Sequence, residues 1–117
     1  MLTLRRDVIV RFALEPVDFR KSIDGLAIAV GAALGRDPMG GELFLFRNRT
    51  RTALKALYWT PNGFVLVYKR LERRRFALPD TPVGTAEVTL PAALLDELLS
   101  GVTRDCRSHD LDEIARE

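Results

Sequence analysis

The side chains in this sequence with the clearest capacity to bind a ligand are the arginines and lysines between Glu42 and Leu78. Nine cations lie in this stretch and seven are Arg, whose planar guanidinium presents a fork of donors suited to phosphate oxygens. Only Glu42 and Glu72 oppose them, so the stretch has a net charge of +7, while the whole chain has +2. The nine cations are Arg47, Arg49, Arg51, Lys55, Lys69, Arg70, Arg73, Arg74 and Arg75.

This concentration of charge has two interpretations. In the first, the cations form a solvated sheet face that discourages pairing with other chains. In the second, which we favour, they contact nucleic-acid phosphates, and each neutralised phosphate adds a salt-dependent gain in affinity. Arg47, Arg49 and Arg51 surround one turn, and four more arginines, Arg70, Arg73, Arg74 and Arg75, cluster where a later apolar run ends. We expect these two groups to lie near each other.

Arg20 and Lys21 form a second, smaller set of candidates. They are expected in the first turn of a helix, where cations oppose the helix dipole. They either pair with Asp24, three or four residues further on, or help the helix N-terminus to bind a phosphate.

No constellation in the sequence predicts catalysis, a metal site or a bound cofactor. The single histidine, His109, lies near the lone Cys106 in a polar segment, and a zinc site or a catalytic nucleophile needs more partners than these. There is no glycine loop for a nucleotide phosphate. Carboxylates can hold Mg²⁺ in a nuclease, but the pairs present, Asp18 with Asp24 and Asp96 with Glu97, are not spaced to converge. We therefore predict a protein that is not an enzyme.

The elements that must position the cations begin with three apolar runs rich in aromatic and branched residues. The runs are Leu43 to Phe46, Ala53 to Trp59 and Phe64 to Leu71, and short polar breaks separate them. This pattern predicts an antiparallel meander. The second break contains Pro61-Asn62-Gly63, in which Asn-Gly is expected to supply the positive φ of a tight hairpin.

Two helices are expected around the meander. Asp18 is the expected N-cap of a helix that ends at Gly35, and Pro91 the first residue of a helix that ends at Gly101. The fold class is therefore α+β, an antiparallel sheet of about five strands with two helices packed on one face. Further strands are expected at Val8–Leu14 and Thr85–Leu90, with Phe76–Leu78 extending the sheet.

The length and composition indicate one domain. Residues 1–102 are expected to form it, and residues 103–117, which mix both charge signs, to form a flexible tail. No apolar run approaches the ~20 residues of a membrane helix. Cys106 has no partner for an internal disulfide, which favours the cytoplasm.

Several motifs, in order along the chain, resemble a family of accessory proteins encoded by bacterial transposons of the insertion sequence sixty-six group. These accessory proteins are called TnpB or Orf2, and they are distinct from the RNA-guided nuclease that is also named TnpB. The stretch Asp18–Leu26, DFRKSIDGL, is similar to the family's D-x-R-K-x-x-D-G-L. The resemblance covers about residues 7 to 101. Its other parts are Asp37-Pro38, LFLFRNR at Leu43–Arg49, KALYW at Lys55–Trp59, GFVL at Gly63–Leu66, KRLE at Lys69–Glu72 and Arg75-Phe76.

The resemblance implies a protein that assists a separate DDE transposase, together with the element's other accessory protein, and does not itself catalyse transposition. One departure lies in the first hairpin, where the family commonly has R-N-R-x-G-D-R-x-K. Here Arg51, Thr52 and Ala53 occupy the G-D-R positions, so the turn geometry and its cations are expected to differ.

These observations predict non-catalytic help to a transposase through DNA phosphates bound by an Arg-rich sheet surface, in the cytoplasm at the nucleoid. The alternative is an adaptor that binds the transposase or the other accessory protein and does not touch DNA. Phosphate contacts do not read sequence, so any sequence specificity is expected to belong to the transposase.

Overall fold

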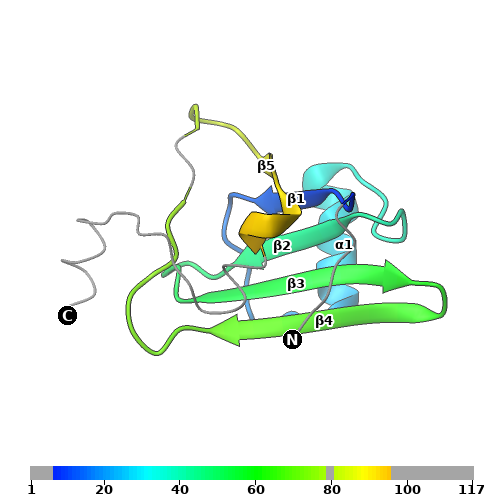
Figure 1. Cartoon of the computed structure of the whole chain (residues 1–117), viewed down its shortest axis with the longest axis horizontal. Helices are drawn as coiled ribbons and strands as arrows, with labels where there is room; N and C mark the ends of the chain where they lie inside the picture. Colours follow the sequence, from blue (N-terminus) through cyan, green and yellow to red (C-terminus); the bar gives the residue numbers. More distant parts are fainter. Residues whose placement is uncertain (1–6, 79–80, 96–117) are drawn as a thin grey trace.

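A computed structural model describes residues 7–78 and 81–95 of the 117-residue chain (Figure 1). The cations of the meander lie on the strands of a five-stranded sheet and on the loops that follow them, and a helix covers one face of the sheet. The elements are β1 (Val10–Ala13), α1 (Ile23–Leu34), β2 (Leu43–Arg47), β3 (Ala53–Thr60), β4 (Gly63–Arg70) and β5 (Glu87–Leu90).

The strand order is β4-β3-β2-β1-β5. The predicted meander is confirmed, because β2 pairs antiparallel with β3 and β3 with β4. The expectation of a purely antiparallel sheet is wrong at one pair, since β1 runs parallel to β2, with Val10 opposite Leu43. The chain crosses over through α1 between these two strands and so re-enters the sheet in the same direction. β5 closes the other side of β1 as an antiparallel strand.

Both faces of the sheet are buried, which explains the unbroken apolar run of β2. Phe44 and Phe46 point to one face, where they meet Leu26 and Val30 of α1. Leu45 points to the other face, where it joins Phe76 and Leu95 among other apolar side chains. The helical turn at 92–95 and α1 therefore lie on opposite faces, and the expectation of two helices on one face is wrong (Figure 1). The remainder of the predicted second helix and the predicted tail lie outside the described residues.

The first helix begins later than predicted. Its N-cap is Ser22, whose Oγ accepts from the N–H of Ile23, so Asp18 is not the cap and Arg20 and Lys21 precede the helix. The end is as predicted, because Gly35 adopts φ 66° and its N–H closes the last turn.

Two smaller expectations also differ from the structure. Residues 76–78 form no strand, although Phe76 is buried against the sheet. The β3–β4 hairpin turns through Pro61 and Asn62 between Thr60 and Gly63, and neither Asn62 nor Gly63 has a positive φ. No helix in the described part of the chain is long and apolar enough to cross a membrane.

Candidate nucleic-acid interface

The two arginine groups of the meander meet at one end of the sheet. The β3–β4 ladder has Ala53 opposite Arg70 as its last pair, and the backbone contacts continue past it. The N–H of Leu71 donates to the Thr52 carbonyl at 2.7 Å, and the N–H of Phe76 donates to the Arg51 carbonyl at 2.7 Å. The segment after β4 is thereby held against the β2–β3 turn, as the sequence analysis predicted.

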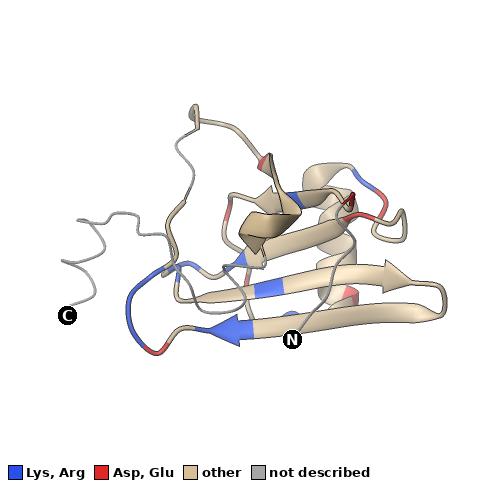
Figure 2. Ribbon diagram, in the orientation of Figure 1, with Lys and Arg blue, Asp and Glu red and all other residues tan. Residues whose placement is uncertain are grey.

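We call this part of the surface the basic end of the sheet. Figure 2 shows its cations on the β2–β3 turn, the last residues of β4 and the loop that follows. Arg70 forms an ion pair with Glu72 in which both side chains are largely exposed. The basic end consists of the exposed Arg49, Arg70, Arg73 and Arg74 and the half-buried Arg51, Lys69 and Arg75.

The β2–β3 turn is fixed by Asn48, whose role the sequence analysis did not recognise. Its Oδ1 accepts from the N–H groups of Thr52 and Ala53 at 2.9 and 3.1 Å, and its Nδ2 donates to the Thr52 hydroxyl at 2.9 Å. Asn is typical of turns for this reason, which is the signal that identifies it. Arg51 in this turn has φ 63°, a conformation that favours glycine. The residue that occupies the family's glycine position therefore keeps a glycine-like backbone.

Arg47 is half-buried, and its guanidinium donates to two backbone carbonyls. Its Nε donates to the Leu14 carbonyl at 2.7 Å and its Nη1 to the Asn48 carbonyl at 3.3 Å. Burial lowers the pKa of this guanidinium, and the nearby Arg51 lowers it further. Arg47 joins the end of β2 to the chain that leaves β1, and so positions the turn.

Lys55 is enclosed more completely, with only 8 % of its surface exposed. Its Nζ donates to the carbonyls of Phe19 and Lys21 at 3.0 and 2.7 Å. The same nitrogen lies 4.9 Å from the centre of the Phe19 ring and 5.3 Å from that of Tyr68. Lys55 is thus a structural cation that fastens the segment before α1 to β3, and it does not belong to the basic end.

Arg20 and Lys21 are exposed, but not in a helical turn. The Arg20 guanidinium, 91 % exposed, forms an ion pair with Asp18 at 2.6 Å. Its hydrogen bonds hold the pKa of the Asp18 carboxyl well below the usual range. Asp18 therefore offsets the charge of Arg20, and the expected pairing of Arg20 with Asp24 is replaced by a pairing within the loop.

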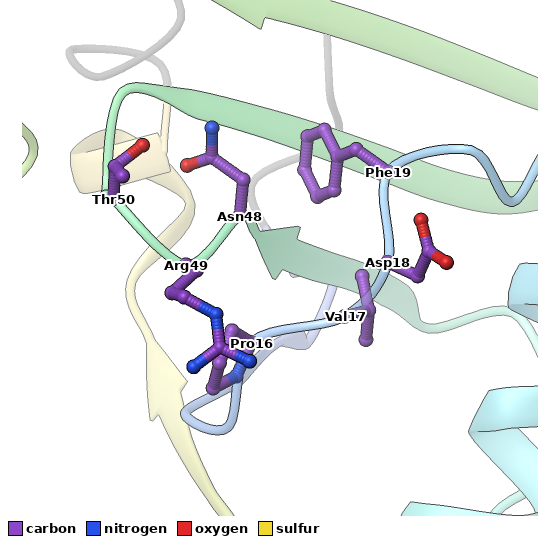
Figure 3. A pocket seen from close by; sticks show the side chains of 7 residues that line it. All are labelled: Pro16, Val17, Asp18, Phe19, Asn48, Arg49 and Thr50. Atoms are coloured by element: carbon purple, nitrogen blue, oxygen red, sulfur yellow. The ribbon is translucent and has the colours of Figure 1, made fainter.

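A pocket of about 440 Å³ joins this loop to the basic end. Figure 3 shows it between the segment Pro16–Phe19 and the turn Asn48–Thr50, with the Arg49 side chain at its rim. The Asn48 amide and the Thr50 hydroxyl are already hydrogen-bonded within the turn. Asp18 is paired with Arg20, so among the residues that line the pocket the charge left to meet a ligand is on Arg49. Arg49 is exposed and belongs both to the lining of this pocket and to the basic end.

The cations on the opposite part of the sheet are neutralised within the protein. Arg11 on β1 donates to both carboxylate oxygens of Glu42, at 2.8 and 2.9 Å, and its Nη1 lies 3.3 Å from Glu87 on β5. Arg36 donates to Glu87 at 2.7 Å. These pairs raise the pKa values of Arg11 and Arg36 and lower that of Glu42, with the side-chain hydrogen bonds as the main cause. Among the described residues, unbalanced positive charge is therefore found at the basic end.

Comparison with known proteins identifies the family. The family model described as IS66 Orf2 like protein matches residues 8–108, which extends the similarity beyond Val102. The uncharacterized protein y4jC of Sinorhizobium fredii is 35% identical over 89 residues, 76% of each chain. The uncharacterized protein y4hO of the same organism is 35% identical over 102 residues, 87% of each chain. No solved structure matches the chain. The chain therefore belongs to the IS66 Orf2-like family, and this membership implies an accessory role in transposition.

Proposed function

We propose that this protein assists transposition without catalysing it, by binding DNA phosphates at the basic end of the sheet. The observation that carries the proposal is the joining of the β2–β3 turn to the segment after β4, which gathers cations from two distant parts of the sequence. Arginines in such a cluster can each contact a different phosphate of one backbone. The protein would act in the cytoplasm at the nucleoid, together with the DDE transposase and the other accessory protein of the element.

The same chemistry determines what this surface would recognise. Phosphate contacts fix the position of a protein on a duplex but carry no sequence information. The helix α1 is held to the sheet by Leu26 and Val30, and the cations of the basic end lie on strands and loops. Sequence specificity for the ends of the element would then come from the transposase.

Fluorescence anisotropy tests the proposal, with a labelled duplex from the element end and a scrambled duplex titrated at several salt concentrations. The variant Arg49→Ala/Arg70→Ala/Arg73→Ala removes three exposed cations that hold no backbone group in the structure. We expect at least tenfold weaker binding to both duplexes. The slope of log affinity against log salt is expected to fall by about 2 to 3, because about 0.9 counterion is released for each phosphate contact.

A matched control separates the basic end from net charge alone. Ile28→Glu/Met39→Glu/Val83→Glu lowers the net charge by the same three units at exposed positions outside the basic end. The control is expected to keep most of the affinity and the original salt slope. Equal losses in the two variants would contradict a localised site.

Absence of binding at low salt by the unmodified protein would overturn the DNA proposal. In that case the basic end would face an acidic protein surface, as in an adaptor. Retention of the transposase or the other accessory protein on this chain after nuclease treatment would then identify it as an adaptor.

A further inference from the structure

The edge strand β4 has a free side along its whole length in the described structure. Its eight residues, Gly63–Arg70, pair with β3 on one side, and no described segment pairs with the other. None of these residues is fully buried, and Tyr68 is 57 % exposed. A long apolar edge with unpaired N–H and C=O groups is a template for another strand.

The hairpin determines which backbone groups of β4 point away from β3. Thr60 is opposite Gly63 across the two-residue turn, so Gly63 exchanges hydrogen bonds with β3. Hydrogen bonding alternates along an antiparallel pair. The N–H and C=O groups of Phe64, Leu66 and Tyr68 therefore point outward, where an added strand would meet them.

The side chains of this edge are arranged almost symmetrically about Leu66. The sequence from Phe64 to Tyr68 is FVLVY, an aromatic, a valine, a leucine, a valine and an aromatic. If a second copy lay antiparallel with Leu66 opposite its counterpart, Phe64 would face Tyr68 and Val65 would face Val67. Aromatic and β-branched pairs of this kind are favourable across strands.

The charges agree with the same register. Lys69 would lie opposite Gly63 of the other copy and Arg70 opposite Asn62, so no cation would face another cation directly. Like charges placed opposite each other destabilise strand pairing, and this arrangement avoids them. The two basic ends would lie at opposite ends of the joined strands and would stay open.

We propose that a second copy of this chain adds to the sheet along β4, antiparallel and with Leu66 on the two-fold axis. The contact is isologous, because each copy presents the same strand to the other, and it closes after two subunits. It joins two five-stranded sheets into one continuous sheet and leaves the other faces of both copies as they are.

Sedimentation equilibrium with the full chain tests the self-association. The unmodified protein is expected to form a dimer whose fraction rises with concentration. Val65→Lys places a charge on the edge at a half-buried residue that is not among those packed against either apolar cluster. It is expected to raise the dimer dissociation constant at least tenfold. Val83→Lys, at a fully exposed loop residue, adds the same charge elsewhere and is expected to leave the constant unchanged.

Disulfide cross-linking tests the register, in chains that carry Cys106→Ser to remove the native thiol. Leu66→Cys is expected to give a covalent dimer on mild oxidation, since directly opposed residues lie about 5.5 Å apart between Cα atoms. Phe64→Cys is expected to give little, since position 64 would oppose position 68 of the other copy. Circular dichroism confirms that each variant is folded.

Either of two results would overturn the proposal. One is a monomer at all concentrations. The other is a dimer that is insensitive to Val65→Lys and cross-links equally well through positions 64 and 66.

Discussion

Lys55 and Lys69 lie on the same meander and carry the same charge, yet their surroundings differ. The ammonium of Lys55 satisfies two backbone carbonyls and lies against two aromatic rings. Lys69 is half-buried near the end of β4, beside the cations of the basic end. At the scale of single residues, a count of charges therefore overstates the number of cations at the basic end. Lys55 and Arg47 donate to backbone carbonyls inside the fold. Arg51 belongs to the basic end but also donates to the Phe76 carbonyl at 3.4 Å, and the other meander cations form the rest of the basic end.

Replacing Lys55 by Met tests this division. The substitution keeps the length of the side chain but leaves the carbonyls of Phe19 and Lys21 without their donor. We expect a loss of about 1–3 kcal/mol in the free energy of unfolding, measured by urea denaturation. DNA affinity of the folded variant and its salt slope are expected to stay unchanged. The control, Lys69→Met, should do the opposite, with little effect on stability and a smaller salt slope. A reduced salt slope in Lys55→Met would contradict a purely structural role.

At the scale of elements, the β2–β3 turn shows how a departure from the family pattern is accommodated. Arg51 stands where the family commonly has glycine and still has φ 63°. Its N–H donates to the Asn48 carbonyl, and its own carbonyl accepts from Phe76. The backbone bonds made by the turn therefore hold Arg51 in a conformation that costs about 1 kcal/mol or more for a residue with a Cβ.

Two substitutions at Arg51 separate the backbone conformation from the side chain. Arg51→Gly relieves the strain but makes the unfolded chain more flexible, so we expect a change in unfolding free energy within about 1 kcal/mol. Arg51→Val keeps the strain and adds a branched Cβ, and should destabilise the protein by about 1–3 kcal/mol. Thermal melts of both variants measure the difference. Equal stability of the two would show that the turn is not held at positive φ.

The elements differ in how far the sequence could predict them. β2, β3 and β4 were predictable because each is a run of aromatic and branched residues ended by turn residues. The parallel pairing of β1 with β2 was not, because it depends on which strand lies beside which after the crossover through α1. The start of α1 was misplaced because Asp18 and Ser22 are both suitable caps, and Asp18 instead pairs with Arg20.

The candidate site was predictable to the same limited extent. The closeness of the arginines of the β2–β3 turn to those at the end of β4 could be predicted from the meander, because the start of β3 must lie beside the end of β4. The enclosure of Lys55 could not, since it requires the segment before α1 to lie over β3. Its one local signal is that Lys55 shares a strand face with Ala53 and Leu57, both of which are buried.

At the scale of the whole molecule, charge is separated between the two ends of β2. Arg47 and the basic end lie at its last residue, while Glu42 immediately precedes its first. Glu42 joins Arg11 of β1, which also reaches Glu87 of β5, and Glu87 in turn holds Arg36 beyond the end of α1. This network connects β1 and β5 to the chain that enters β2 from α1. The carboxylates that hold the fold together are thus distant from the cations proposed to meet DNA.

Acid should therefore destabilise the protein through Glu42. Its pKa is lowered from the ordinary value of 4.5, chiefly by the Arg11 hydrogen bond, so its contribution is complete above pH 4.5. The contribution is lost as the pH falls through the lowered pKa of the folded state, because the protonated carboxyl no longer attracts Arg11. Glu42→Gln is expected to be less stable than the unmodified protein by about 1–3 kcal/mol at pH 7, and the difference to shrink below pH 4.5. Urea denaturation across this pH range measures it.

The pair of Arg70 with Glu72 provides the matched control, because it joins the same residue types at 3.3 Å with both side chains largely exposed. Glu72→Gln should change stability by less than about 1 kcal/mol at any pH.

Glu72→Gln also removes a carboxylate from the basic end and is therefore expected to strengthen DNA binding slightly, while Glu42→Gln leaves binding by the folded protein unchanged. A pH-independent difference for Glu42→Gln would mean that the Arg11 pair does not hold β1 to β2. A change in DNA affinity with Glu42→Gln but not with Glu72→Gln would place the DNA surface at the Glu42 end of β2 and contradict the proposed role of the basic end.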